Sequence, residues 1–116
     1  MSVINEKDRK VIHEVNPENG SGNLYLEKLL TSPNASKNLR TFAKATLECG
    51  ASVGFHTHEG ESEAYYILSG EAEYNDNGVL RNIKAGDVTF TPSGEGHGIK
   101  NIGEEPLVFL PLIIFD

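Results

Sequence analysis

The sequence predicts an all-β fold, a small barrel or sandwich of short antiparallel strands. Three observations lead to this prediction. The chain has 116 residues and 12 glycines, and in the second half these glycines stand between short apolar runs. The runs follow one another closely, as short strands joined by turns do. No segment carries a convincing helical period. The length fits one domain spanning residues 1–116.

In the first half of the chain the strand signals are weaker. Residues 10–15 alternate loosely and could form a first strand, and the Asn/Pro/Gly-rich segment 16–20 is a strong turn signal. Residues 24–30 suit a second strand, although their leucines would also suit a short helix. A polar loop is expected over 31–36, followed by a weakly alternating strand over 39–47.

From Gly50 onward, turn-forming residues recur regularly between short apolar runs. We expect seven further strands, over residues 52–57, 63–68, 71–74, 79–83, 87–90, 97–101 and 107–114. Turn residues separate them all. Asn77-Gly78 is a good hairpin turn, because both residue types tolerate a positive φ angle.

The net charge narrows the classes of partner, and the cysteine content narrows the choice of cellular compartment. With 17 acidic and 10 basic residues the formal net charge is -7, which argues against nucleic acid and anionic membranes as partners. Cys49 is the single cysteine, so no intrachain disulfide can form, as in a reducing compartment. The N-terminus lacks a signal-peptide pattern, and the apolar tail 107–115 is too short to cross a bilayer. We therefore expect a cytoplasmic protein.

Three of the four histidines lie between residues 50 and 101 and are candidate metal ligands. His56 and His58 are two residues apart, so on a strand both side chains point to the same face and could chelate one ion. Glu63 follows past a loop and can point into the same interior, and His97 could complete the set. Taken singly, each of these four residues has an ordinary explanation other than metal binding. Histidines also occur in turns, and a lone carboxylate is usually on the surface.

Three neutral imidazoles and one carboxylate suit one divalent transition metal, Mn, Fe, Ni, Co or Zn, better than Ca or Mg. Four protein ligands would leave one or two positions of a five- or six-coordinate ion open. Open positions are what a catalytic metal requires.

The residues around these candidates resemble the two motifs of the cupin superfamily. The first runs Gly50-(five residues)-His56-Thr57-His58-(four residues)-Glu63-(six residues)-Gly70. The second runs Gly86-(five residues)-Pro92-Ser93-Gly94-(two residues)-His97-(three residues)-Asn101. Every signature position is present. The 15 residues between the motifs resemble the short spacer of small single-domain bacterial cupins.

The resemblance implies a cupin-type β-barrel, a double-stranded β-helix or jelly roll with two packed antiparallel sheets and a metal in one mouth. It implies that the ligands are His56, His58, Glu63 and His97. It also implies that the motif glycines and Pro92 shape turns, and that Asn101 supports the site without binding the ion. His13 matches no motif position and is expected to be an ordinary surface or packing residue.

Strand parity predicts which side chains line the interior. If the ligands face inward, the residues expected to share that direction are Ser52, Gly54, Tyr65, Ile67 and Ile99, with Tyr66 and Leu68 facing outward. A β-bulge would invert any of these assignments. Tyr65 is the candidate catalytic residue, a phenol able to orient a ligand or donate a proton. It could equally be an aromatic that fills the barrel.

Two further expectations concern charge and assembly. Arg40 and Lys44 share strand parity, so they either pair with an anionic ligand or stand on a solvated face. Cys49 is expected to be a small packing residue.

The tail 107–115 shows little alternation, which suggests burial on both faces, one of them against a second subunit. Similar small cupins pair through their sheets, so a homodimer is expected.

The resemblance leaves two classes of function open, because one scaffold hosts many chemistries. A metal-dependent enzyme would act on a small anionic carboxylate, hydroxy acid or sugar-like molecule by dioxygenase, decarboxylase, isomerase or lyase chemistry. The alternative is a non-catalytic module that binds or senses a metal-chelating metabolite.

Overall fold

The computed structural model describes residues 3–30 and 35–116 and consists almost entirely of β-structure. Within these two segments it has the strands β1 (Lys10–Val15), β2 (Asn23–Leu30), β3 (Leu39–Leu47), β4 (Ser52–Thr57), β5 (Glu61–Ser69), β6 (Glu71–Asp76), β7 (Val79–Lys84), β8 (Val88–Thr91), β9 (Gly96–Asn101) and β10 (Leu107–Phe115). Two single-turn 3-10 helices, η1 (Glu6–Asp8) and η2 (Pro17–Asn19), flank β1. The prediction of an all-β fold is confirmed.

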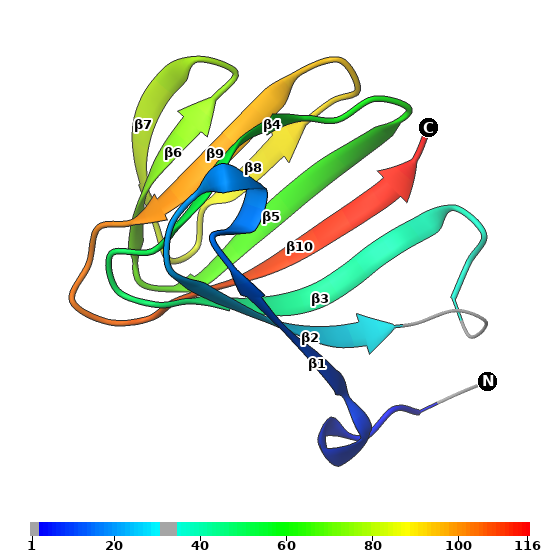
Figure 1. The fold of residues 1–116 in the computed structure, drawn as a ribbon. Helices are drawn as coiled ribbons and strands as arrows, with labels where there is room; N and C mark the ends of the chain where they lie inside the picture. Colours follow the sequence, from blue (N-terminus) through cyan, green and yellow to red (C-terminus); the bar gives the residue numbers. More distant parts are fainter. Residues whose placement is uncertain (1–2, 31–34) are drawn as a thin grey trace.

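The strands form two antiparallel sheets that face each other (Figure 1). The larger sheet has the strand order β1-β2-β3-β10-β5-β8, and the smaller has the order β4-β9-β6-β7. Apolar side chains from both sheets fill the space between them, among them Phe109, Leu47, Ile67 and Leu107 from the larger sheet and Ile99 from the smaller. This is the two-sheet jelly roll that the motifs implied. No helix in the described segments has the length and apolarity needed to cross a bilayer.

The turns follow the residues that favour them. Asn77 and Gly78 have φ angles of 48° and 101°, so they form the tight hairpin between β6 and β7 that the sequence predicted. The turn over 16–20 becomes η2, in which Glu18 has a φ angle of 51°. Residues 24–30 form a strand and not a helix, because β2 pairs along its length with β1 and β3. Residues 31–34 of the expected polar loop lie outside the described segments.

A β-bulge in β4 overturns part of the predicted inward face. Val53 pairs with Ile99 and His56 with His97, so two residues of β4 stand opposite one of β9. Val53 is therefore buried in the core, and Ser52, which parity placed inward, lies half-buried at a contact with Ser21. The inward prediction for Ser52 was wrong. On β5, whose pairing with β10 is regular from Glu61 to Ile67, Tyr65 and Ile67 are buried while Tyr66 and Leu68 are exposed, as predicted.

A second bulge separates Arg40 from Lys44. Where β3 pairs with β10, Thr41 is the partner of Ile113 and Leu39 is the partner of Ile114. Arg40 is therefore an extra residue of β3 that stands opposite no residue of β10. Arg40 consequently reaches the cavity between the sheets. Lys44 stands between Ala43 and Ala45, which are fully buried, so it points to the outer face. The shared direction expected for the two cations was wrong.

Three other local expectations have mixed outcomes. His13 lies on the surface, stacked on Tyr25, as expected. Cys49 is exposed, so its expected packing role was wrong. The tail β10 is buried on its inner face, at Leu107 and Phe109, but its outer face is half-buried or exposed within one chain.

Candidate metal centre

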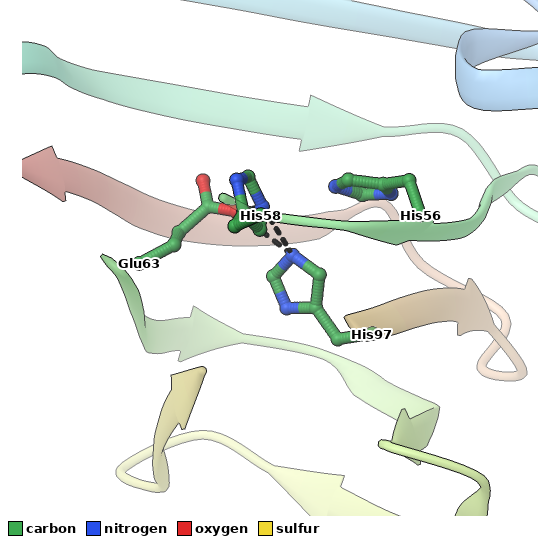
Figure 2. Close-up of side chains that lie close together, drawn as sticks. All are labelled: His56, His58, Glu63 and His97. Atoms are coloured by element: carbon green, nitrogen blue, oxygen red, sulfur yellow. Dashed lines mark hydrogen bonds and ion pairs between the residues drawn. The ribbon is translucent and has the colours of Figure 1, made fainter. Parts of the chain in front are cut away.

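Four side chains from three strands converge at one point between the sheets (Figure 2). His56 stands near the end of β4, His58 directly follows that strand, Glu63 comes from β5 of the opposite sheet, and His97 comes from β9. His56 and His97 are direct cross-strand partners, which brings their rings together. One candidate ligand atom from each residue lies within 4.8 Å of the others. The structure thus brings together all four residues that the sequence singled out.

The spacing of the central atoms fits a small ion. Glu63 Oε1 lies 2.9 Å from His58 Nε2 and 2.8 Å from His97 Nε2. The two Nε2 atoms are 3.1 Å apart. Two ligand atoms at right angles, each about 2.1 Å from a transition-metal ion, are separated by about 3.0 Å. The observed separations match this distance between two neighbouring ligand atoms. Nitrogen and carboxylate donors are also of the type that such ions bind.

Two of the imidazoles are held by acceptors on their outer nitrogens. His56 Nδ1 donates to the backbone oxygen of Gly54 at 2.8 Å, and His58 Nδ1 donates to Glu61 Oε1 at 2.8 Å. A carbonyl or carboxylate oxygen can only accept, so in each neutral ring the proton sits on Nδ1. The lone pair is then on Nε2, the atom of His58 that faces the centre.

Two hydroxyl groups hold His97 in a similar way, by contacts with its outer ring nitrogen. Its Nδ1 lies 2.7 Å from the Tyr74 hydroxyl and 3.0 Å from Thr91 Oγ1. Either hydroxyl can rotate to accept the Nδ1 proton. Burial lowers the pKa of His97, an effect that its hydrogen bond with Glu63 partly offsets. A lowered pKa keeps the ring neutral, the form in which imidazole binds metal.

Glu61 links the cluster to a cation at the mouth of the barrel. Besides accepting from His58, it accepts from Arg40 Nη1 at 2.5 and 2.6 Å. Burial alone would raise the pKa of Glu61, but the hydrogen bonds and charges of Arg40 and His58 outweigh it and lower that pKa. Glu61 therefore stays ionised and able to hold His58. Sequence reasoning missed it, although Glu61 and Glu63 share a face of β5 by simple alternation.

Tyr65 stands against the cluster, as parity predicted. Its ring stacks on His97, with the centroids 4.9 Å apart, and packs against Phe109 at 4.7 Å. Burial, followed by the nearby charge of Glu63, raises the pKa of its hydroxyl well above 10.0. The phenol therefore stays protonated and can donate a hydrogen bond. It fills the barrel and lines the cavity at once, so the two alternatives for this residue are not exclusive.

A cavity of about 310 Å³ opens above the cluster. His56, His58 and Glu63 contribute to its lining, together with aromatic and aliphatic side chains of the larger sheet. The charged residues around it are Glu14, Glu18, Lys28, Arg40 and Glu61. A concave, partly apolar space with a few convergent polar groups is typical of small-ligand sites.

Comparison with known proteins agrees with this geometry. A family model described as Cupin domain matches residues 43–115. The chain is 48% identical over 99 residues to the "Oxalate-binding protein" of Thermotoga maritima, covering 85% of this chain and 82% of that protein. It is 37% identical over 100 residues to "Oxalate decarboxylase OxdC" of Bacillus subtilis, covering 82% of this chain but only 26% of that protein.

Solved structures show the same fold. A crystal structure of a protein described as a predicted oxalate decarboxylase from Thermotoga maritima matches with a TM-score of 0.93 and 43% identity, covering 99% of this chain and 100% of that one. The polyketide cyclase RemF from Streptomyces resistomycificus matches with a TM-score of 0.78 and 20% identity, covering 99% of this chain and 79% of that one. At that identity the second similarity concerns the fold alone.

Proposed function

This chain belongs to the cupin domain family, and we propose that it holds one divalent transition metal and uses it to bind a small chelating carboxylate of the oxalate class. The proposed ligands are His56, His58, Glu63 and His97. The observation that carries the proposal is the convergence of their donor atoms within 4.8 Å beneath an open cavity. Mn, Fe, Ni, Co and Zn all suit this donor set.

The chain's own residues define what can bind there. When present, the ion supplies positive charge and open coordination positions for carboxylate oxygens. Tyr65 offers a protonated hydroxyl at the cavity wall. Glu61 and Arg40 form an ion pair beside His58, so the ring that faces the ligand is fixed in orientation. Oxalate is the reference ligand, because two relatives carry it in their names.

Metal loading and oxalate binding are tested together. The metal-loaded protein should hold one ion per chain by elemental analysis, and titration calorimetry should show oxalate binding that disappears once a chelator has removed the ion. His97→Ala should lose the ion, since it removes a buried donor. His13→Ala is the matched control, a histidine on the exposed surface. Equal metal affinity in His97→Ala and the parent would overturn the proposal.

Turnover is the second candidate, and Tyr65 is the observation that favours it. Decarboxylation breaks a carbon–carbon bond and leaves an electron pair on carbon that a proton must quench. Tyr65 lines the cavity with its ring stacked on His97, and its hydroxyl stays protonated at neutral pH because burial raises its pKa. If oxalate is decarboxylated, Tyr65→Phe should lower kcat by about 100-fold with metal content unchanged. Unchanged turnover would remove Tyr65 from the chemistry and leave it as packing.

We further propose that two copies pair through the outer face of the larger sheet. On β8, β5 and β10 this face presents large apolar side chains with exposed fractions from 37% to 67%, namely Val88, Phe90, Tyr66, Leu68, Leu112 and Ile114. Their strands are adjacent, so the side chains form one continuous surface. A patch of this kind usually marks an interface.

The dimer is tested by analytical ultracentrifugation. Phe90→Glu should convert a dimer into a monomer, because it places a charge within the buried surface. Leu80→Glu is the control, since Leu80 is equally exposed but lies on β7 of the other sheet. A parent protein that sediments as a monomer would refute this pairing.

A further inference from the structure

The cavity has more room than oxalate needs. A closed cavity of about 150 Å³ accommodates benzene, which has six non-hydrogen atoms, and oxalate also has six. The cavity here is about twice that volume, at about 310 Å³. Even with an ion and a water molecule in place, space remains for a ligand of about nine to twelve non-hydrogen atoms.

A cation lines the cavity far from the metal cluster. Lys28 on β2 is the cross-strand partner of Ala43, which is fully buried, so both side chains lie on the inner face. Strands β2, β3, β10 and β5 are successive in the larger sheet. The backbones of Lys28 and Tyr65 are therefore three strand spacings apart, about 14 Å. The long lysine arm spans part of that gap. Oxalate on the cluster is too short to cross the remainder.

Lys28 also stands opposite a like charge. Its cross-strand partner on β1 is Lys10, and two like charges in direct opposition are destabilising. In residues 3–30 and 35–116, no carboxylate lies within 4.0 Å of the Lys28 ammonium group. Arg40, by contrast, is already neutralised by Glu61. A ligand anion between the two lysines would relieve their repulsion.

Two further carboxylates of the cavity indicate which uncharged groups such a ligand carries. Glu14 and Glu18 line the side formed by β1 and η2. Ionised carboxylates accept hydrogen bonds and repel a further anion, so they suit the hydroxyl groups of a ligand. The cavity therefore presents three kinds of polar group: the metal cluster, hydrogen-bond acceptors, and the ammonium group of Lys28.

We propose that the natural ligand is a hydroxylated dicarboxylate of four to six carbon atoms, with one end on the metal cluster and its far carboxylate on Lys28. The inference rests on the proposed function and deepens it, since it names the class of carboxylate. Lys28 then acts as a specificity residue that selects for the second negative charge.

Tartrate and threonate make a matched pair of probes, because they share four carbons and differ in one far group, a carboxylate or a hydroxymethyl. Titration calorimetry on the metal-loaded protein should show tartrate binding at least about tenfold more tightly than threonate. Lys28→Gln should abolish that preference while metal content stays as in the parent and the melting temperature does not fall. Lys84→Gln, an exposed lysine on β7, is the control and should keep the preference.

The outcomes separate the two levels of the proposal. If oxalate binds the metal-loaded protein but tartrate gains nothing over threonate, or if Lys28→Gln keeps the preference, the dicarboxylate assignment is overturned and the proposed function stands. If neither oxalate nor the longer acids bind, the proposed function fails as well.

Discussion

Replacing Glu61 by glutamine tests the arrangement around the metal cluster without touching a proposed ligand. Glu61 accepts the Nδ1 proton of His58 at 2.8 Å, and that hydrogen bond orients the ring so that Nε2 faces Glu63. Glutamine has the same size but no charge. Its amide can still offer an oxygen to His58, so the ring keeps an acceptor of about half the strength.

The expected magnitude follows from these contacts. Outer partners of metal-binding histidines contribute about 10- to 100-fold to metal affinity, which is about 1.4 to 2.7 kcal/mol. Glu61→Gln keeps a weaker hydrogen bond and should lie near the tenfold end. Glu61→Ala removes the acceptor altogether and should lie near the hundredfold end. Loss of the pair with Arg40 adds little, because that side chain is 52% exposed.

Competition titration against a chelator of known affinity measures the effect. Glu59→Gln is the control, the same substitution two residues away on an exposed side chain. Unfolding curves of the metal-free variants would show whether each still folds. If Glu61→Gln and Glu59→Gln hold the metal as tightly as the parent, the role assigned to Glu61 is refuted.

Three other predictions concern stability. The depressed pKa of His97 means that the unfolded chain takes up its proton more readily, so the metal-free protein should be fully stable above pH 6.5 and weaken as the pH falls below it; urea unfolding should show this slope, and His97→Gln should flatten it. Gly54→Ala would place a methyl group against the backbone of η2 and should cost about 1–3 kcal/mol in chemical denaturation, so an unchanged midpoint would contradict the tight docking of that turn. Asn101→Ala removes donors to the oxygens of Leu47 (3.0 Å) and Glu105 (2.8 Å) and should cost about 2–4 kcal/mol, while a large loss of metal affinity at full stability would argue against its purely structural role.

Much of the fold could be predicted because its signals are local. The hairpin at Asn77-Gly78 depends on two residues that tolerate positive φ angles. The inward direction of Tyr65 follows from the alternation of a regular strand. Such features need no knowledge of distant contacts, so the sequence predicts them well. The choice of strand over helix at 24–30, in contrast, came from pairing with β1 and β3.

The sequence by itself determined that this is an all-β chain with three histidines and one glutamate in two spaced motifs, because residue type and spacing set strand alternation and donor chemistry. Only the tertiary structure decided what surrounds them. Bulges in β3 and β4 moved Arg40 into the cavity and Ser52 out of the interior, and the pairing of β2 with β3 placed Lys28 far across the cavity from the metal cluster. Register shifts and contacts between sheets depend on residues remote in the chain, so no local pattern encodes them.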